Sequence, residues 1–513
     1  MKCSLDALAA TVAAACLGIA SCATQETDGA GARLGKVDIT VSCNAAAQRE
    51  FNVAMAYYHS FAWAQMQEPL ERVLKADPGC GMAYWLRTLG ALGNPFSWPA
   101  LITPATLSSG AGFLETARRV GLNSQRERDY VDALAVYFTD YDKVGHKPRA
   151  KALETALERV MQRYPRDTEA AILYALVLSA NFDPTDKKYT NQLKATRILE
   201  PIFKAQPEHP GVAHYLIHSY DYPPIAKHGV NAARRYGKIA PDAAHALHMP
   251  SHIFTRVGAW KESIESNRSS ARVGGDKSFD KWHAYDYMVY AHLQLGQERA
   301  AREVVTEAIA NPARIDHPAT AYAYSAMSAR LVLERGAWKE AAGLALVPPA
   351  EAYPWKKYAF AEANNAFARG VGAAMSGDAT AARAEVTRLQ QLRNATKLPY
   401  WIEEIAIQSE VVQGLSLCAE GNRAGCLEVL RKAADREDST EKHVVTPGRL
   451  VPAREMLAYM QLEAGDAAAA LREFEAVLER DPNRRRAFAG AARAAERAGD
   501  ARKAAHYSAL LGR

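Results

Sequence analysis

The chain is dominated by a regular succession of helical segments and glycine turns. From about residue 44 onward, apolar residues recur three and four positions apart, which is the spacing of one face of an α-helix. The alternation of apolar and polar residues and the Asn-Gly turns that mark β-hairpins do not occur there. The glycine turns follow one another at intervals of 34 to 44 residues, at Gly258, Gly296, Gly336, Gly377, Gly421, Gly465 and Gly499. This periodicity predicts stacked helix pairs rather than a set of separate globular domains.

Residues 453–511, "AREMLAYMQLEAGDAAAALREFEAVLERDPNRRRAFAGAARAAERAGDARKAAHYSALL", resemble the tetratricopeptide repeat, a helix–turn–helix unit of about 34 residues. Gly465 and Asp466 match its turn, Ala470 its close helix contact and Pro482 its end. The blocks "DPGCGMAYW", "GVAHYLIHSYDYPP" and "HMPSHIFTRVGAW" are similar to those of exported bacterial tetratricopeptide proteins. The resemblance implies an all-α solenoid, a right-handed superhelix of stacked antiparallel helix pairs with a concave groove, and it implies no particular activity.

Composition excludes several classes of protein. Hydrophobic residues make up 49% of the 513 residues and charged residues 23%, which is typical of a folded protein and not of a disordered one. The net charge of +6 is small for this length, so we expect no nucleic-acid partner. The sequence has no His-Glu-x-x-His, Gly-x-Ser-x-Gly, Walker or Gly-x-Gly-x-x-Gly string, which removes the commonest hydrolase and nucleotide-binding classes.

The first residues read as a targeting segment. Lys2 precedes a small, apolar run from Leu5 to Ala20, too short for a confident membrane span. Ile19-Ala20-Ser21-Cys22 resembles a bacterial lipobox, in which Cys22 would be acylated; cleavage after Ala23 and soluble export is the alternative. We expect an exported, periplasmic protein that contacts the outer membrane only through this lipid.

Four further cysteines lie in the exported part of the chain. In an oxidising compartment they are expected to form two disulfides, and proximity in the chain favours Cys43–Cys80 and Cys418–Cys426. Buried free thiols are the alternative. No Cys-x-x-Cys motif occurs, so thioredoxin-like chemistry is not indicated.

Histidines are concentrated in one central stretch of the chain. His214 and His218 are four residues apart, as are His248 and His252, so each pair shares a helix face. His248 also follows His214 by 34 residues, one repeat period, and His252 follows His218 by the same interval. The two pairs therefore occupy matching positions of adjacent repeats.

The resemblance implies that positions two, five, nine, twelve and thirteen of a first helix line the groove. The residues at these positions are His214, His218, Asp221, His248, His252, Arg256, His283, Asp286 and Tyr290. His59 is also at such a position, several repeats away. We place His209, His228, His245 and His292 outside these positions and expect them to be ordinary core or surface residues.

Imidazole and carboxylate groups at groove positions of successive repeats predict a metal site. The proposed ligands are His214, His218, Asp221, His248, His252, His283 and Asp286, for zinc, copper or iron. Their number suits one metal with supporting residues, or two adjacent metals. Such a site would serve hydrolysis or oxygen activation, with Arg256 holding a substrate carboxylate and Tyr290 donating a proton as the weaker candidates.

These patterns predict a domain order and two rival functions. The expected segments are a signal peptide (1–22), a linker (23–43), irregular hairpins (44–208), the central hairpins with the His/Asp cluster (209–315), further hairpins (316–448) and a regular C-terminal pair with its cap (449–513). Segments 94–110 and 435–448 are expected to be loops, the second exposed. The groove would hold either a metal centre with a small-molecule substrate, or an envelope protein or peptide bound by a non-catalytic scaffold.

Overall fold

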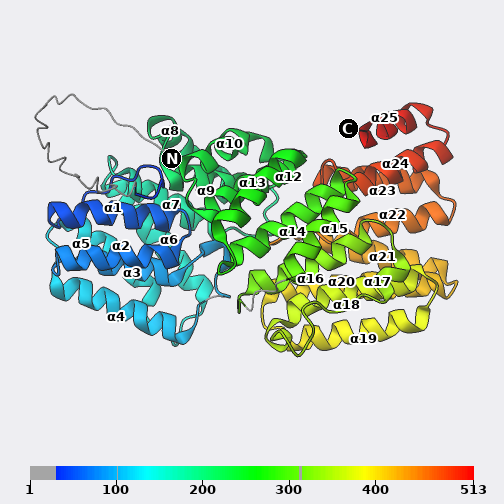
Figure 1. The fold of residues 1–513 in the computed structure, drawn as a ribbon, viewed down its shortest axis with the longest axis horizontal. Coiled ribbons are helices and arrows are strands. Elements are labelled where there is room, and N and C mark those ends of the chain that lie inside the picture. The colour runs from blue at the N-terminus through cyan, green and yellow to red at the C-terminus, as the bar shows by residue number, and fades with distance from the viewer. Residues whose placement is uncertain (1–30, 101, 311–314, 513) are drawn as a thin grey trace, which may run out of the picture. The chain divides into compact units, whose positions relative to one another are not determined.

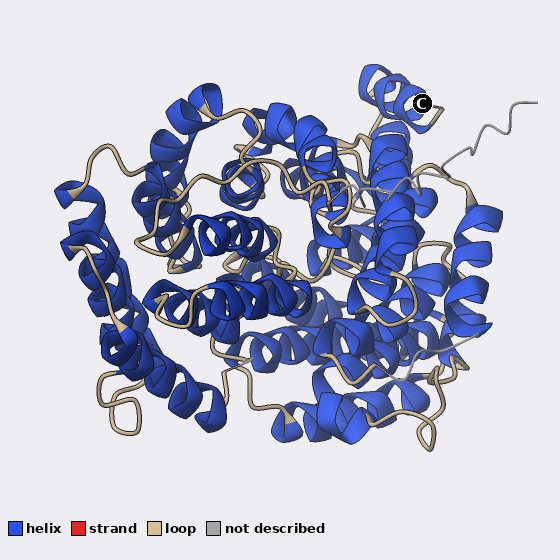
Figure 2. Ribbon diagram, turned by 60° about the vertical axis from the view of Figure 1, so that its left-hand side comes forward, coloured by secondary structure: helices blue, strands red, loops and turns tan. Residues whose placement is uncertain are grey.

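The computed structural model describes residues 31–100, 102–310 and 315–512. Within these ranges the regular structure is helical and no strand occurs (Figure 2), so the predicted all-α fold is confirmed. None of these helices is both long and apolar enough to cross a membrane. Arg33–Arg513 form one compact unit. The expected signal peptide and Cys22 lie outside the described residues.

The helices of the first half of the chain are 5 to 18 residues long. They are α1 (Ala45–His59), α2 (Trp63–Ala76), α3 (Gly81–Leu92), α4 (Pro104–Val120), α5 (Gln125–Ala135), α6 (His146–Arg163), α7 (Thr168–Ala180), α8 (Thr190–Ala205), α9 (Pro210–Tyr220), α10 (Val230–Ile239), α11 (Ala244–His248) and α12 (Pro250–Val257). Short 3₁₀ turns lie at Pro95–Ser97, Val136–Phe138 and Ala226–Gly229.

The second half continues the same pattern. Its helices are α13 (Trp260–Gly274), α14 (Phe279–Gln294), α15 (Glu298–Ala310), α16 (Pro318–Leu333), α17 (Trp338–Ala342), α18 (Ala359–Met375), α19 (Ala379–Ala395), α20 (Pro399–Ala419), α21 (Arg423–Asp438), α22 (Ala453–Glu463), α23 (Ala467–Arg480), α24 (Arg485–Arg497) and α25 (Ala501–Leu511), with a 3₁₀ turn at Trp355–Tyr358. Helices that follow one another in the chain pack side by side, as α18, α19, α20 and α21 do in Figure 1.

The turn between α22 and α23 shows how the sequence builds one helix pair. Gly465 has a φ of 92°, a left-handed conformation that glycine adopts without strain. Asp466 then caps α23 by accepting a hydrogen bond from the Ala469 N–H at 3.0 Å. Phe474 of α23 is fully buried and lies so close to Gly490 of α24 that a Cβ there would be 2.2 Å from its ring. The missing side chain of Gly490 therefore permits the close packing of these two helices.

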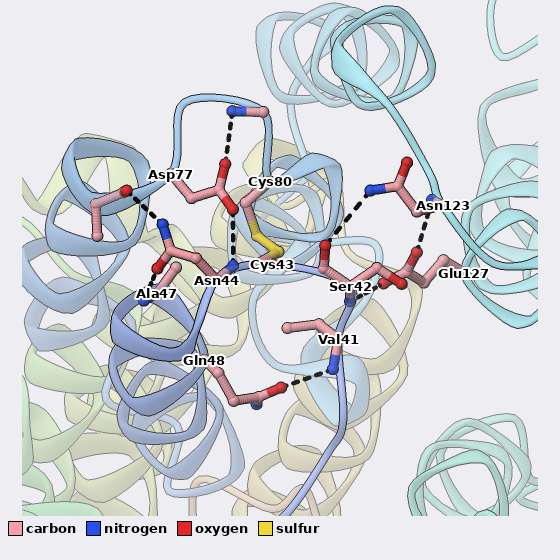
Figure 3. The surroundings of a disulfide bond; sticks show 12 residues. Val41, Ser42, Cys43, Asn44, Ala47, Gln48, Asp77, Cys80, Asn123 and Glu127 are labelled. Carbon is pink, nitrogen blue, oxygen red and sulfur yellow. Dashed lines mark hydrogen bonds between the residues drawn. A yellow bond between two sulfur atoms is a disulfide. The ribbon is translucent and has the colours of Figure 1, made fainter.

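The residues before α1 are packed rather than loose. Leu34, Val37, Ile39 and Val41 are buried, although the segment has no helix. A disulfide joins Cys43 to Cys80, and a second joins Cys418 to Cys426. Figure 3 shows the first bond with the polar contacts around it, including the Val41 N–H that donates to Gln48 Oε1 at 2.8 Å and the Asn44 N–H that donates to Asp77 Oδ2 at 2.8 Å. The start of the helical stack is thereby tied to the segment that precedes it.

The expectation of a loop over 94–110 is wrong in part. Helix α4 begins at Pro104, because Thr103 and Thr106 form a reciprocal capping box at its N-terminus.

The expectation of an exposed loop over 435–448 is also wrong in part, because most of the segment is a loop but it is not exposed. Helix α21 extends to Asp438, and residues 439–449 then run into the protein, where they form what we call the insert segment. Lys187 donates to Glu441 Oε1 at 2.7 Å, and Arg330 donates to Thr446 Oγ1 and to the Gly448 carbonyl, both at 2.7 Å. These partners lie far away in the sequence, so local composition did not indicate the burial.

Candidate metal centre

Helix α9 carries His214 and His218 on one face. Its N-cap is His209, whose Nδ1 accepts from the Val212 N–H at 3.3 Å, and Pro210 takes the first helical position, where no N–H is needed. His214 is 0% exposed and His218 4% exposed. Both rings therefore face the interior.

Two short helices carry the next three histidines. Helices α11 and α12 are joined through Met249, whose backbone remains helical (φ −52°, ψ −36°). Pro250 lacks an N–H and interrupts the hydrogen-bond ladder at that point. His245, His248 and His252 are spaced by three and four residues, so they share one face across this break.

Six imidazoles form two adjacent groups of three. In each group one ring nitrogen per residue lies within 4.8 Å of the others. We call His214, His218 and His245 the α9 trio, and His248, His252 and His283 the α12 trio. The groups adjoin, because the His218 and His252 ring centroids are 6.0 Å apart, as are those of His245 and His248.

Hydrogen bonds set the tautomers of two rings in the α12 trio. His248 Nδ1 lies 2.7 Å from Asn267 Oδ1, and the same amide donates through Nδ2 to the Ser263 carbonyl at 2.8 Å, so its oxygen must accept. His252 Nδ1 lies 2.9 Å from the Asp221 carboxylate. Both Nδ1 atoms therefore carry hydrogen, and in the neutral rings both Nε2 atoms present lone pairs.

These two Nε2 atoms face each other at 3.1 Å. Two lone pairs in contact repel unless a proton or a cation lies between them. Two imidazole nitrogens bound tetrahedrally to one zinc ion, at 2.0–2.1 Å each, are about 3.3–3.4 Å apart. His283, whose ring centroid is 4.3 Å from that of His248, is 6% exposed, and its Nδ1 has no partner among the described residues. The trio thus has the spacing and the lone pairs of a metal site.

Burial also favours the neutral, metal-binding form of these rings. Burial, followed by the neighbouring imidazoles, holds the pKa of His248 and of His283 well below the usual value. Burial lowers the pKa of His252 to about 4, even though Asp221 acts in the opposite direction. A shared proton is therefore a poor means of separating the two lone pairs at neutral pH.

The α9 trio has similar features. His214 Nδ1 donates to the His59 carbonyl at 2.7 Å, which leaves its Nε2 to face His245 Nε2 at 3.2 Å. His218 Nε2 is buried and has no partner among the described residues. Phe96 stacks on the His218 ring with centroids 3.9 Å apart.

A third group, His59, Glu169 and His209, differs because its hydrogen bonds are complete. His59 Nε2 and His209 Nε2 lie 3.0 Å and 2.7 Å from the two Glu169 oxygens. His59 Nδ1 pairs with Tyr215 OH at 2.9 Å, and His209 Nδ1 caps α9. Neutral rings satisfy all these contacts, so this group is adequately explained as buried structural support, and His209 has the ordinary core role that we expected.

Asp221 supports the α12 trio rather than joining it. Besides His252, its oxygens accept from Arg256 Nε at 2.8 Å and from Lys442 Nζ of the insert segment at 3.0 Å. Burial lowers the pKa of Lys442 to about 8, although Asp221 opposes this shift. Arg256 is thus held by a buried carboxylate and is not free to bind a substrate carboxylate.

Two other predicted residues lie away from the imidazoles. Asp286 accepts from Arg330 Nε at 2.8 Å, and both side chains are 0% exposed. Burial raises the pKa of Asp286 above the usual value, and Arg330 opposes this shift. Tyr290 packs edge-to-face on Trp260, with ring centroids 5.7 Å apart, and lies under Arg330. The repeat register predicts that Asp286 and Tyr290 face the groove with the histidines, but both side chains contact Arg330 instead.

A cavity of about 70 Å³ opens beside the six imidazoles. His218 and His245 of the α9 trio and His252 and His283 of the α12 trio line it. The rest of the lining is mostly aromatic and aliphatic: Phe61, Trp63, Met249, Phe279, Ala319, Val444 and Val445, with Asn94, Ser97 and His317. The cavity has room for a few waters or one small ligand and not for a peptide.

Several residues of the site lie outside the predicted set. The expectation of an ordinary role for His245 is wrong, because its spacing of three and seven residues from His248 and His252 places it on the same face. Lys442, Asn267 and Tyr287, whose OH lies 3.3 Å from His252 Nε2, had no local signal. His228 and His292 lie outside both trios, as expected; His292 bonds Gln297 at 2.8 Å.

Comparison with known proteins gives only distant structural likenesses. No protein-family profile matches the chain, and no curated protein matches it. A structure of Naa15/Naa10 bound to HypK-THB has 12% identity and a TM-score of 0.26, covering 91% of this chain and 75% of the other. Yeast Tom70 has 13% identity and a TM-score of 0.32, with coverage of 90% and 88%. A monomeric IFIT1 mutant with Gppp-AAAA has 11% identity and a TM-score of 0.37, with coverage of 83% and 90%.

Proposed function

We propose that this tetratricopeptide-like helical protein binds a divalent transition metal through His248, His252 and His283. The observation that carries the proposal is the 3.1 Å contact between His248 Nε2 and His252 Nε2, whose Nδ1 atoms both donate to acceptors. The ligands are imidazole, which suits zinc, copper or iron. Asn267 and Asp221 play the part of the outer hydrogen-bond acceptors that orient metal-binding histidines.

Three protein ligands and an adjoining cavity are typical of a catalytic rather than a structural metal site. An ion held there would have a position left for water, and it would lower the pKa of that water for hydrolysis, or it would activate oxygen if it were copper or iron. The small, mostly apolar cavity favours a small-molecule ligand. Arg256 would act by positioning Asp221 rather than by touching substrate.

We also propose that the protein works outside the cytoplasm. The Leu5–Ala20 run, the lipobox-like Ser21-Cys22 and the two disulfides, Cys43–Cys80 and Cys418–Cys426, support export. Acylation of Cys22 would attach the chain to the outer membrane. A mass spectrum of the mature N-terminus tests this directly, since the lipidated form begins at Cys22 and the soluble form begins after Ala23.

Elemental analysis of protein purified without a histidine tag tests the metal site. We expect stoichiometric zinc, copper or iron in the parent and its loss in the double variant His248→Ala/His252→Ala. His228→Ala, a change at an exposed histidine outside both trios, is the matched control and should keep the metal. Metal-free parent protein that still captures an envelope protein or peptide would favour the non-catalytic scaffold.

A further inference from the structure

We propose that the α9 trio binds a second transition-metal ion, so that the chain holds a pair of ions sharing one small anionic ligand in the cavity between the trios. This inference rests on the proposed function, which assigns the first ion to the α12 trio. It adds His245 to the ligands and gives His214 and His218 an ion of their own.

The contact between His214 and His245 repeats the arrangement in the α12 trio. The His59 carbonyl can only accept, so the 2.7 Å contact to His214 Nδ1 places the hydrogen there and leaves a lone pair on Nε2. That lone pair faces His245 Nε2 at 3.2 Å, close to the 3.1 Å between His248 and His252. An ion bound to both nitrogens would remove the repulsion between them.

A carboxylate lies near Nδ1 of His245, as Asp221 lies near Nδ1 of His252. Asp280 Oδ1 lies 3.7 Å from His245 Nδ1, and both atoms are buried with no hydrogen-bond partner among the described residues. A hydrogen on Nδ1 directed at this carboxylate would leave the Nε2 lone pair free for a metal. Carboxylate–histidine pairs of this kind orient imidazole ligands and increase their basicity.

His218 completes the trio. Its ring is 4% exposed and is held by the stacked ring of Phe96, and its Nε2 lies in the interior without a partner among the described residues. A buried polar nitrogen of this kind is costly unless something binds it. The contrast with His59 and His209, whose nitrogens all have partners, shows that burial of histidine in this fold does not by itself leave nitrogens unpaired.

The cavity connects the two trios. Each contributes two of its imidazoles to the lining, so a ligand in the cavity would contact both ions. The volume of about 70 Å³ limits that ligand to a hydroxide, a few waters or a small anion such as azide. All six protein ligands are neutral, Asp221 is already paired with Arg256 and Lys442, and Asp280 supplies at most one negative charge. Two divalent ions would therefore retain excess positive charge, which favours an anion between them.

Copper(II) reconstitution tests the pair. Untagged protein stripped with a chelator is reloaded with Cu²⁺, dialysed against glycine and assayed for copper per chain and for electron-paramagnetic spins per chain. The compared variants are His245→Gln in the α9 trio, His283→Gln in the α12 trio, and His228→Gln as the control, each checked for parent-like circular dichroism.

We expect two copper ions per chain in the parent and in the control, and one in each trio variant. Ions that share a ligand couple magnetically, so the parent should show well under two spins, and azide should shift its absorption spectrum. If the parent binds one copper ion, which His245→Gln keeps and His283→Gln loses, the second site is wrong and the proposed function stands. Two full spins per chain that azide does not affect would contradict the shared ligand, and a parent that binds no copper would contradict both proposals. The number of copper ions bound by the parent tests the second site even if a variant fails to fold.

Discussion

Lys442 Nζ lies 3.0 Å from Asp221 Oδ2, a carboxylate 221 residues earlier in the chain. Through this contact the insert segment 439–449 reaches the carboxylate that orients His252. Both side chains are nearly buried, 6% and 5% exposed, so the ion pair is poorly screened by solvent.

Lys442→Met should therefore destabilise the protein by about 2–4 kcal/mol, because only Arg256 would then compensate the buried charge of Asp221. The free energy of unfolding in urea measures the loss, and hydrogen exchange should show faster opening of the insert segment. Lys277→Met, at an exposed lysine, should change stability by less than about 0.5 kcal/mol. Equal effects of the two substitutions would contradict a structural role for the buried pair.

Asp221→Asn should weaken metal binding without removing a ligand. The amide cannot match the carboxylate as an acceptor for His252 Nδ1–H, and loss of such a partner typically costs 10–100-fold in affinity. Competition with a chromophoric chelator measures the change. Asp38→Asn, at an exposed carboxylate outside the site, should leave the affinity unaltered. An unchanged affinity in Asp221→Asn would remove this carboxylate from the metal site.

Gly211→Ala and Gly112→Ala should change stability in opposite directions, although both replace a helical glycine. A Cβ at Gly211 of α9 would lie 2.4 Å from His59 Nδ1, whereas one at Gly112 of α4 would meet nothing within 4 Å. We expect a loss of about 1–3 kcal/mol at Gly211 from overpacking and a gain of about 0.5–1 kcal/mol at Gly112. Thermal unfolding of the two variants distinguishes these outcomes; a stabilised Gly211→Ala would show that α1 and α9 leave room for a methyl group at this contact.

His146 should contribute to acid sensitivity. Burial, assisted by Arg149 and Lys147, lowers its pKa to about 4, so the unfolded chain binds a proton more readily than the folded protein. Its contribution to stability is present above the unfolded pKa near 6.5 and is lost as the pH falls toward 4. The loss at pH 5 is at most about 2 kcal/mol, and it is smaller to the extent that water reaches the partly exposed ring.

His146→Gln should accordingly lose less stability between pH 7 and pH 5 than the parent. Urea unfolding at the two pH values measures the difference. His506→Gln, at an exposed histidine, should keep the full loss seen in the parent. A His146→Gln variant with the parent's pH dependence would show that this ring is not the group responsible.

The sequence predicted the helical repeat and much of the site because both depend on spacing along helices. The 34-residue interval between the two histidine pairs depends only on the repeat period, and the structure brings these four residues together with His283. His245 belongs to the same pattern, because it precedes His248 (position five) by three residues and so falls at position two, itself a groove position. Its placement outside the groove positions was an error in applying the register and not an effect of tertiary structure.

The remaining differences arise from contacts between distant parts of the chain. The register could not show that Arg330 of α16 pairs with Asp286, or that Lys442 pairs with Asp221. Charged residues in 435–448 indicated solvent exposure, but two of those charges, on Glu441 and Lys442, are neutralised by partners more than two hundred residues away. Pairing of buried charges depends on tertiary structure and has no periodic signature in the sequence.

Anomalous diffraction from crystals grown with the metal that copurifies tests the central claim most directly. We predict a peak at the metal's absorption edge between His248 Nε2 and His252 Nε2, at about 2.0–2.1 Å from each if the ion is zinc. A map with no peak there, and with a hydrogen bond between the two rings instead, would contradict the metal site.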